Sequence, residues 1–93
     1  MRMQSAHFLV KGKVQGVFFR ANTKTKAEEL GIRGWVKNTA GGDVEIVAQG
    51  STDQLKIFEE WCRKGPARAR VDDFYSDETD AEEFDSFKIV REK

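Results

Sequence analysis

A run of nine residues that ends in an arginine carries the clearest chemical signal in the sequence. It reads GKVQGVFFR from Gly12 to Arg20 and lies between a predicted strand and a predicted helix. Its two glycines allow tight turns, so that backbone N–H groups can converge on an anion, and the start of the helix adds a positive end. The planar guanidinium of Arg20 matches phosphate oxygens two at a time. These residue types in this order predict a phosphate-binding loop.

The composition of the whole chain limits the kinds of protein in which such a loop could act. With 93 residues, the chain is expected to form a single domain over residues 1–93, with one hydrophobic core. Sixteen basic residues balance sixteen acidic ones, so the formal net charge is zero. General nucleic-acid binding, which usually shows a basic excess, is disfavoured, whereas a local basic pocket is compatible with neutrality.

Cysteine usage and hydropathy indicate the compartment. Cys62 is the only cysteine and His7 the only histidine, so the sequence has neither an internal disulfide nor a Cys/His cluster for zinc. No apolar run approaches the length of a membrane span, and residues 8–10 are too short for the core of a signal peptide. We therefore expect a cytoplasmic protein with no membrane partner, and its size and composition make a monomer the expectation.

The elements that must position the loop can be predicted from the spacing of apolar residues. Alternation favours strands, and a repeat of three or four residues favours helices. In chain order we predict a strand at 7–13, a helix at 21–30, strands at 35–39 and 44–49, a helix at 52–64, and strands at 71–76 and 87–91.

Turn and cap residues support these boundaries. Gly31 suits the end of the first helix, and residues 40–43 (Ala-Gly-Gly-Asp) are typical of a hairpin. Ser51 followed by Gln54 predicts a capping box at the start of the second helix, and residues 65–66 (Gly-Pro) end it.

The order strand-helix-strand-strand-helix-strand predicts a ferredoxin-like α+β sandwich. Both helices would pack on one face of an antiparallel sheet, with a short extra strand at its edge. Core candidates share helical spacing or aromatic character, and they are Leu55, Ile57, Phe58, Trp61, Cys62 and Trp35. The acidic residues 77–83 lack the glycine and the alternating spacing of a calcium loop, so we predict a solvated loop.

Further motifs make the sequence resemble the acylphosphatases over nearly its whole length. Beside GKVQGVFFR at 12–20, these are GWVKN at 34–38, GDVE at 42–45, QG at 49–50 and the stretch GPxRxxV at 65–71. One departure is a turn with Gly41 before Gly42, where many members of that family carry Asp-Gly.

The resemblance implies a hydrolase that cleaves the carboxyl–phosphate bond of acyl phosphates to a carboxylate and inorganic phosphate, without metal or cofactor. It places the phosphate-binding arginine on Arg20 and the water-positioning asparagine on Asn38. The phosphate-binding backbone amides fall on Gln15, Gly16, Val17, Phe18 and Phe19. Of the two phenylalanines, we expect one to anchor the loop and the other to line the acyl side of the pocket.

The chemistry agrees with these residue types. The leaving group is a carboxylate, which departs without a strong general acid, so holding the phosphoryl group and placing a water remain as the enzyme's tasks. Neither Arg20 nor Asn38 can act as a base at neutral pH. We therefore expect the proton of the water to pass to a phosphate oxygen of the substrate itself.

Three other functions fit parts of the sequence. A non-catalytic phosphate-binding or regulatory module on the same fold would keep Arg20 and its loop but show no turnover. An accessory domain acting on carbamoyl phosphate would normally be followed by a much longer chain. An RNA-binding module of the same topology is disfavoured, because residues 44–49 carry no aromatic side chain on which a base could stack.

Overall fold

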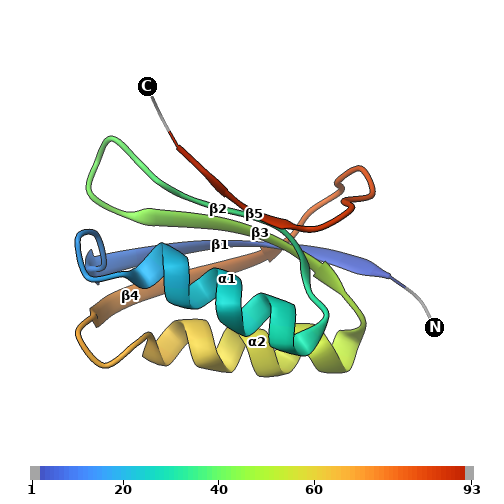
Figure 1. The fold of residues 1–93 in the computed structure, drawn as a ribbon, viewed down its shortest axis with the longest axis horizontal. Coiled ribbons are helices and arrows are strands. Elements are labelled where there is room, and N and C mark those ends of the chain that lie inside the picture. Colours follow the sequence, from blue (N-terminus) through green and yellow to red (C-terminus); the bar gives the residue numbers. More distant parts are fainter. Residues whose placement is uncertain (1–2, 92–93) are drawn as a thin grey trace.

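The computed structural model describes residues 3–91 as two helices packed on one face of a five-stranded sheet (Figure 1). In chain order the elements are β1 (Gln4–Lys13), α1 (Phe19–Leu30), β2 (Arg33–Asn38), β3 (Val44–Gly50), α2 (Thr52–Lys64), β4 (Arg70–Glu78) and β5 (Phe87–Val90). The predicted ferredoxin-like class, with both helices on one side, is confirmed. Neither helix among these residues is long and apolar enough to cross a bilayer.

The strands lie in the order β4-β1-β3-β2-β5, and one pairing differs from the prediction. β1 is antiparallel to β3 and β4, and β2 is antiparallel to β3, but β5 runs parallel to β2. The sheet is therefore mixed. The cause is the connection: β4 ends at the end of the sheet where β2 begins, so a strand that starts there runs in the direction of β2.

Several elements extend beyond the predicted ranges: β1 begins at Gln4 and β2 at Arg33, and β3 and β4 are each longer by one or more residues. Two of the differences, at α1 and at the end of β4, have a clear physical reason. Helix α1 begins two residues early, at Phe19, because Phe18 adopts a left-handed conformation (φ 60°) and its carbonyl oxygen accepts the backbone N–H of Asn22 at 3.0 Å. Strand β4 continues through Asp77 and Glu78, which we had placed in the acidic loop. Its pairing with β1 extends that far because the side chains of an edge strand can point into solvent.

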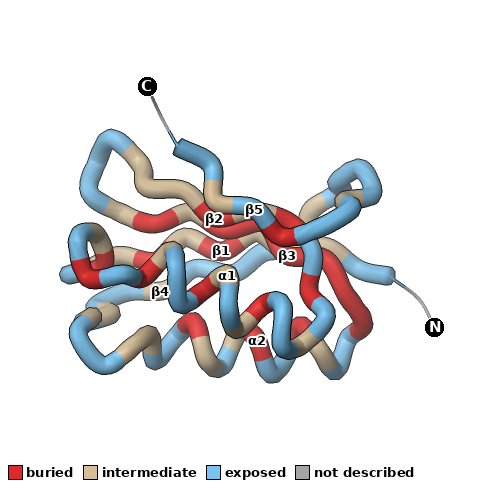
Figure 2. The backbone as a smooth tube through the Cα atoms, in the orientation of Figure 1, coloured by how far each residue is buried: buried red, intermediate tan, exposed pale blue. Residues whose placement is uncertain are grey.

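The core lies between the sheet and the helices, where the buried residues of Figure 2 gather. Phe8, Val10, Phe58 and Cys62 are fully buried there, and Ile57 is 51% exposed, which contradicts its predicted place in the core.

The two faces of β2 explain the position of Trp35. Gly34 and Val36 are buried toward the helices, so Trp35 between them points to the opposite face of the sheet and is half-buried. There the Lys37 ammonium lies 5.4 Å from the centre of its ring. The prediction of a core position for Trp35 was therefore wrong, because alternation along the strand outweighs the apolar character of one side chain.

The predicted helix caps are confirmed. Gly31 ends α1 in the left-handed region (φ 74°). Ser51 and Gln54 form a reciprocal capping box, in which the Gln54 N–H donates to Ser51 Oγ at 3.2 Å and the Ser51 N–H donates to Gln54 Oε1 at 2.8 Å. The Gln54 side chain also donates to the carbonyl oxygen of Leu30 at 2.8 Å, so one cap holds the ends of both helices together.

Candidate active site

A cavity of about 320 Å³ opens at the end of the sheet where β1, β2 and β5 end and α1 begins. In Figure 1 this end lies on the left, where the loop after β1 approaches the turn between β2 and β3. The cavity is lined by segments far apart in sequence, namely Val14, Gly16, Phe18, Phe19, Arg20, Ala21, Asn38, Ile89 and Arg91. Five of the predicted site residues, Gly16, Phe18, Phe19, Arg20 and Asn38, therefore meet at one place.

The β1–α1 loop (residues 14–18) curls around the mouth of this cavity through two unusual backbone conformations. Gly16 has φ 74°, and Phe18 has φ 60°, the one positive φ of a non-glycine residue within residues 3–91. A left-handed conformation at a bulky residue is strained, and such strain concentrates at binding sites. It is held in place by two bonds to the Phe18 carbonyl oxygen, from the backbone N–H and the side-chain amide of Asn22.

The two phenylalanines of the loop differ in burial, whereas the predicted place of one of them on the acyl side of the pocket stays a prediction. Phe19 is 1% exposed and packs against Trp61, with ring centroids 6.2 Å apart, so it anchors the start of α1 in the core. Phe18 is 69% exposed and lines the cavity mouth, where it offers an aromatic surface to whatever occupies the outer part of the cavity.

The cavity is electropositive. Arg20 and Arg91 both line it, no acidic side chain does, and neither guanidinium pairs with a carboxylate of the described residues. The first N–H groups of α1 have no partner inside the helix and add positive potential at the same place. A small anion is the ligand that this arrangement favours.

Asn38 ends β2 beside the two arginines. Together with Arg20, Arg91 and Thr39 it also lines an adjoining hollow of about 330 Å³. Its side-chain oxygen Oδ1 is buried and accepts no hydrogen bond from the described residues. Buried polar atoms of this kind are normally satisfied, so an acceptor left open beside a cavity is a place for a bound water or ligand.

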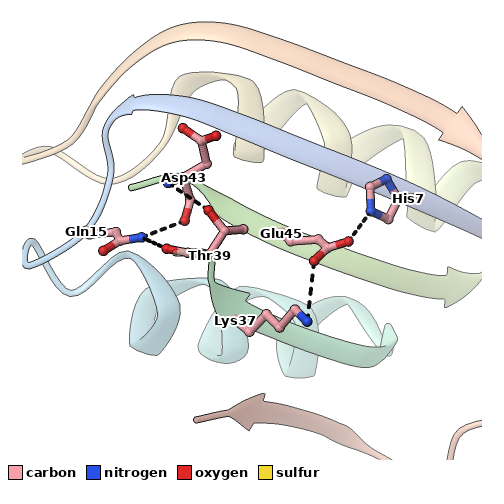
Figure 3. A network of polar contacts seen from close by, with 6 residues as sticks. All are labelled: His7, Gln15, Lys37, Thr39, Asp43 and Glu45. Carbon is pink, nitrogen blue, oxygen red and sulfur yellow. Dashed lines mark hydrogen bonds and ion pairs between the residues drawn. The ribbon is translucent and has the colours of Figure 1, made fainter. Parts of the chain in front are cut away.

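Two predicted residues lie outside the cavity lining. Val17 is 8% exposed and belongs to the core. Gln15 directs its side-chain amide to the β2–β3 hairpin (residues 39–43), where Nε2 donates to the carbonyl oxygens of Thr39 at 2.9 Å and Asp43 at 2.8 Å (Figure 3). The sequence predicts a role only for the backbone amide of Gln15, because nothing local indicates side-chain partners 24 and 28 residues away.

Arg91 was missed for a related reason. The parallel register sets Val90 opposite Lys37, which brings the next residue, Arg91, close to Asn38. A prediction that treats the whole sheet as antiparallel does not place this residue at the site.

His7 lies away from the cavity, on the sheet face that the helices leave open. Its Nε2 is 2.6 Å from Oε2 of Glu45, whose other oxygen is 3.6 Å from the Lys37 ammonium (Figure 3). This agrees with its prediction as a surface strand residue. Within residues 3–91, no group of three or more His, Cys, Asp or Glu side chains is placed to hold a metal ion.

The structure is a small ferredoxin-like α+β domain with an arginine-lined cavity between its first loop and its second strand. Comparison with known proteins gives the family. The acylphosphatase family model matches residues 6–89. An acylphosphatase of Marinobacter nauticus is 52% identical over 91 residues, which cover 97% of this chain and 99% of that protein.

Solved structures agree with this match. An acylphosphatase of Coxiella burnetii superposes with a TM-score of 0.90 at 44% identity, over 95% of this chain and 93% of that one. An acylphosphatase of Bacillus subtilis also reaches 0.90, at 34% identity, over 96% and 99%. The chain belongs to the acylphosphatase family, as its motifs indicated.

Proposed function

We propose that this protein hydrolyses the carboxyl–phosphate bond of acyl phosphates, releasing a carboxylate and inorganic phosphate. Family membership supports the reaction, and one structural observation carries the assignment of residues. That observation is the cavity beside the start of α1, which Arg20 and Asn38 both line although they are 18 positions apart in the chain.

The phosphoryl group binds to Arg20 and to the backbone amides of residues 15–19. The guanidinium offers a planar pair of donors, while the loop and the helix start offer N–H groups and positive potential. In the transition state, negative charge is shared among the phosphoryl oxygens. Hydrogen-bond donors that are already in position stabilise this charge without reorganisation. Arg20 meets this requirement because no carboxylate of the described residues competes for its guanidinium.

Asn38 positions the attacking water. Its open acceptor Oδ1 takes a hydrogen bond from the water and directs the oxygen lone pair toward phosphorus. Because Oδ1 is buried, the side-chain amide of Asn38 turns toward the cavity that the residue lines when the water binds.

The chemical step balances without a base from the protein. The water oxygen forms a bond to phosphorus while the bond between phosphorus and the acyl oxygen breaks, and both electrons leave with the carboxylate. One proton of the water passes to a phosphate oxygen, so a dianionic acyl phosphate and water give a carboxylate and dihydrogen phosphate. A carboxylic acid has a pKa of roughly 4, so the departing group needs no general acid.

The composition of the chain and the residue types of the site also suggest the cofactor requirement, the compartment and the oligomeric state. We expect the reaction to proceed without metal or cofactor, in a cytoplasmic, monomeric protein whose residues 1–93 act as one domain. The size of the chain and its 34% of charged residues support a monomer, and the single cysteine supports a reducing compartment.

Release of phosphate from benzoyl phosphate or acetyl phosphate, with a chelator present, tests the activity. No turnover by the intact protein would overturn it. Arg20→Lys should lower both affinity and kcat, the latter by about 10²-fold, because a point charge does not restore the planar fork.

Asn38→Ala should lower kcat with little change in KM, because the water is positioned only for the chemical step. An effect confined to KM would contradict the role of Asn38. A group of the enzyme that titrates near pH 7 in the rate profile, and disappears with one side chain, would contradict proton transfer to the substrate.

A further inference from the structure

The side chain of Gln15 joins the two halves of the site. It follows β1 on the loop that faces the phosphate-binding pocket, and both of its amide hydrogens are used on the hairpin that follows Asn38. The donor–acceptor distances of 2.9 Å to Thr39 O and 2.8 Å to Asp43 O are those of well-formed hydrogen bonds. The side chain therefore connects the loop after β1 with the β2–β3 hairpin, beside the cavity and outside its lining.

The two carbonyls that accept these bonds are fixed within the hairpin. The backbone N–H of Thr39 donates to Asp43 O at 2.9 Å, and that of Gly42 donates to Thr39 O at 3.2 Å. The Asp43 N–H donates to the Thr39 hydroxyl at 3.1 Å. Gln15 thus attaches the loop to a rigid turn whose first residue is bonded directly to Asn38.

A second contact fastens the same hairpin to β1. The Lys11 ammonium lies 2.9 Å from Asp43 Oδ2, and this hydrogen bond raises the pKa of Lys11. That ion pair holds the hairpin to the sheet, whereas Gln15 holds it to the loop beyond the sheet. Gln15 therefore ties the loop itself to the hairpin next to Asn38.

We propose that the Gln15 side chain is a positioning residue of the reaction, which keeps Asn38 in line with the phosphoryl group on the loop. This inference rests on the proposed function of Asn38 and Arg20 and adds a residue that acts through them. A misplacement of about 1 Å between reacting groups lowers rates by about 10²-fold, so a hydrogen-bonded brace between the loop and the hairpin matters to kcat.

The first test is Gln15→Met, which keeps the length of the side chain and removes both donors. We expect kcat to fall by about tenfold or more, with little change in the inhibition constant of inorganic phosphate. A phosphate constant that rises in step with the loss of kcat would overturn the proposal, since Gln15 would then be shaping the phosphate pocket alone.

The matched control is Gln49→Met, at the opposite end of the sheet. Gln49 is 4% exposed, and its side-chain amide makes three hydrogen bonds, with Ser5 Oγ, Glu82 O and the N–H of Phe84. Its loss should lower the thermal midpoint at least as much as the loss of Gln15 and leave kcat close to that of the unaltered protein. Equal losses of kcat in both variants would show a general effect on stability and refute a positioning role.

A double-mutant cycle separates this inference from the proposed function. In an Asn38→Ala background, Gln15→Met should cause little further loss of kcat, because the residue it positions is gone. Full and independent losses in the double variant would overturn the proposal. If Gln15→Met were fully active while Asn38→Ala were not, the proposed role of Gln15 would be wrong and the role of Asn38 would stand. Full activity of Asn38→Ala would overturn both.

Gln15→Glu allows a test by pH, because a purely structural role of Gln15 would not make kcat of this variant depend on pH. At neutral pH its carboxylate would face two carbonyl oxygens, and protonation would restore one donor. We expect kcat relative to the unaltered protein to rise as the pH falls through the pKa of the new side chain. A ratio that stays constant with pH would contradict the proposed brace.

Discussion

Gly16→Ala, paired with Gly42→Ala, tests the loop most directly. Both glycines have positive φ, 74° and 93°, and an added Cβ would meet no heavy atom within 4 Å at either position. The expected loss of unfolding free energy is therefore only the cost of holding alanine in a left-handed backbone conformation, about 1–2 kcal/mol. For a domain of this size it corresponds to about 4–8 °C in Tm for each kcal/mol. Only Gly16 lines the cavity, so the two variants differ in what the methyl group obstructs.

The assay is thermal denaturation with and without inorganic phosphate, together with turnover of benzoyl phosphate. At a phosphate concentration 100 times its Kd, the unaltered protein should gain about 2.7 kcal/mol. Gly42→Ala should keep this stabilisation by phosphate, whereas Gly16→Ala should lose most of it, and most of its turnover, because its methyl group enters the space beside the loop amides. Equal phosphate gains in the two variants would refute a phosphate site at this loop.

A third substitution calibrates the steric contribution. An alanine at Gly34 would place its Cβ 1.9 Å from the carbonyl oxygen of Val47, with φ at 136°. Such a contact with backbone cannot be relieved by rotating a side chain, so Gly34→Ala should destabilise the protein far more than the other two. A loss for Gly16→Ala as large as that for Gly34→Ala would show that the loop has less room than the structure indicates.

Three further predictions concern the second helix, the core thiol and the last strand. Ser51→Ala removes the acceptor of the Gln54 N–H and should lower the unfolding free energy by about 1 kcal/mol, while Ser51→Asn should retain most of it. Burial raises the pKa of the Cys62 thiol, so above about pH 9 the unfolded chain loses this proton first and stability falls. The stability difference from Cys62→Ala, measured by denaturant titration, should accordingly shrink there, and a constant difference would contradict the buried thiol. Arg91→Gln should weaken phosphate competition by up to roughly fivefold, equivalent to about 1 kcal/mol for an exposed charge, whereas Lys88→Gln on the same strand should not.

Local patterns predicted most of the fold because local forces decide it. The Ser51 capping box, the Gly31 cap and the bounds of α2 depend on neighbours within one or two turns, and all three are confirmed. The start of α1 was misplaced because a left-handed Phe18 is intrinsically unfavourable and persists only through its surroundings.

For the site, too, the sequence predicts what depends on local motifs and misses what depends on distant contacts. The motif at 12–20 and Asn38 could be proposed from the sequence, and the structure brings Arg20 and Asn38 to one cavity. Arg91 and the side-chain role of Gln15 depend on strand order and on contacts across the sheet. Such contacts join residues far apart in the chain, where spacing carries no information.

The parallel pairing of β5 bears on when the pocket can form during synthesis. Phe87 packs into the core against Phe58, with ring centroids 6.0 Å apart, and the strand it begins delivers Ile89 and Arg91 to the cavity. A nascent chain that has emerged only through β4 has the loop and Asn38 but lacks this wall. Binding of inorganic phosphate to ribosome-bound chains of increasing length should therefore strengthen only once residue 91 has left the exit tunnel, which would make the pocket a reporter of completed folding.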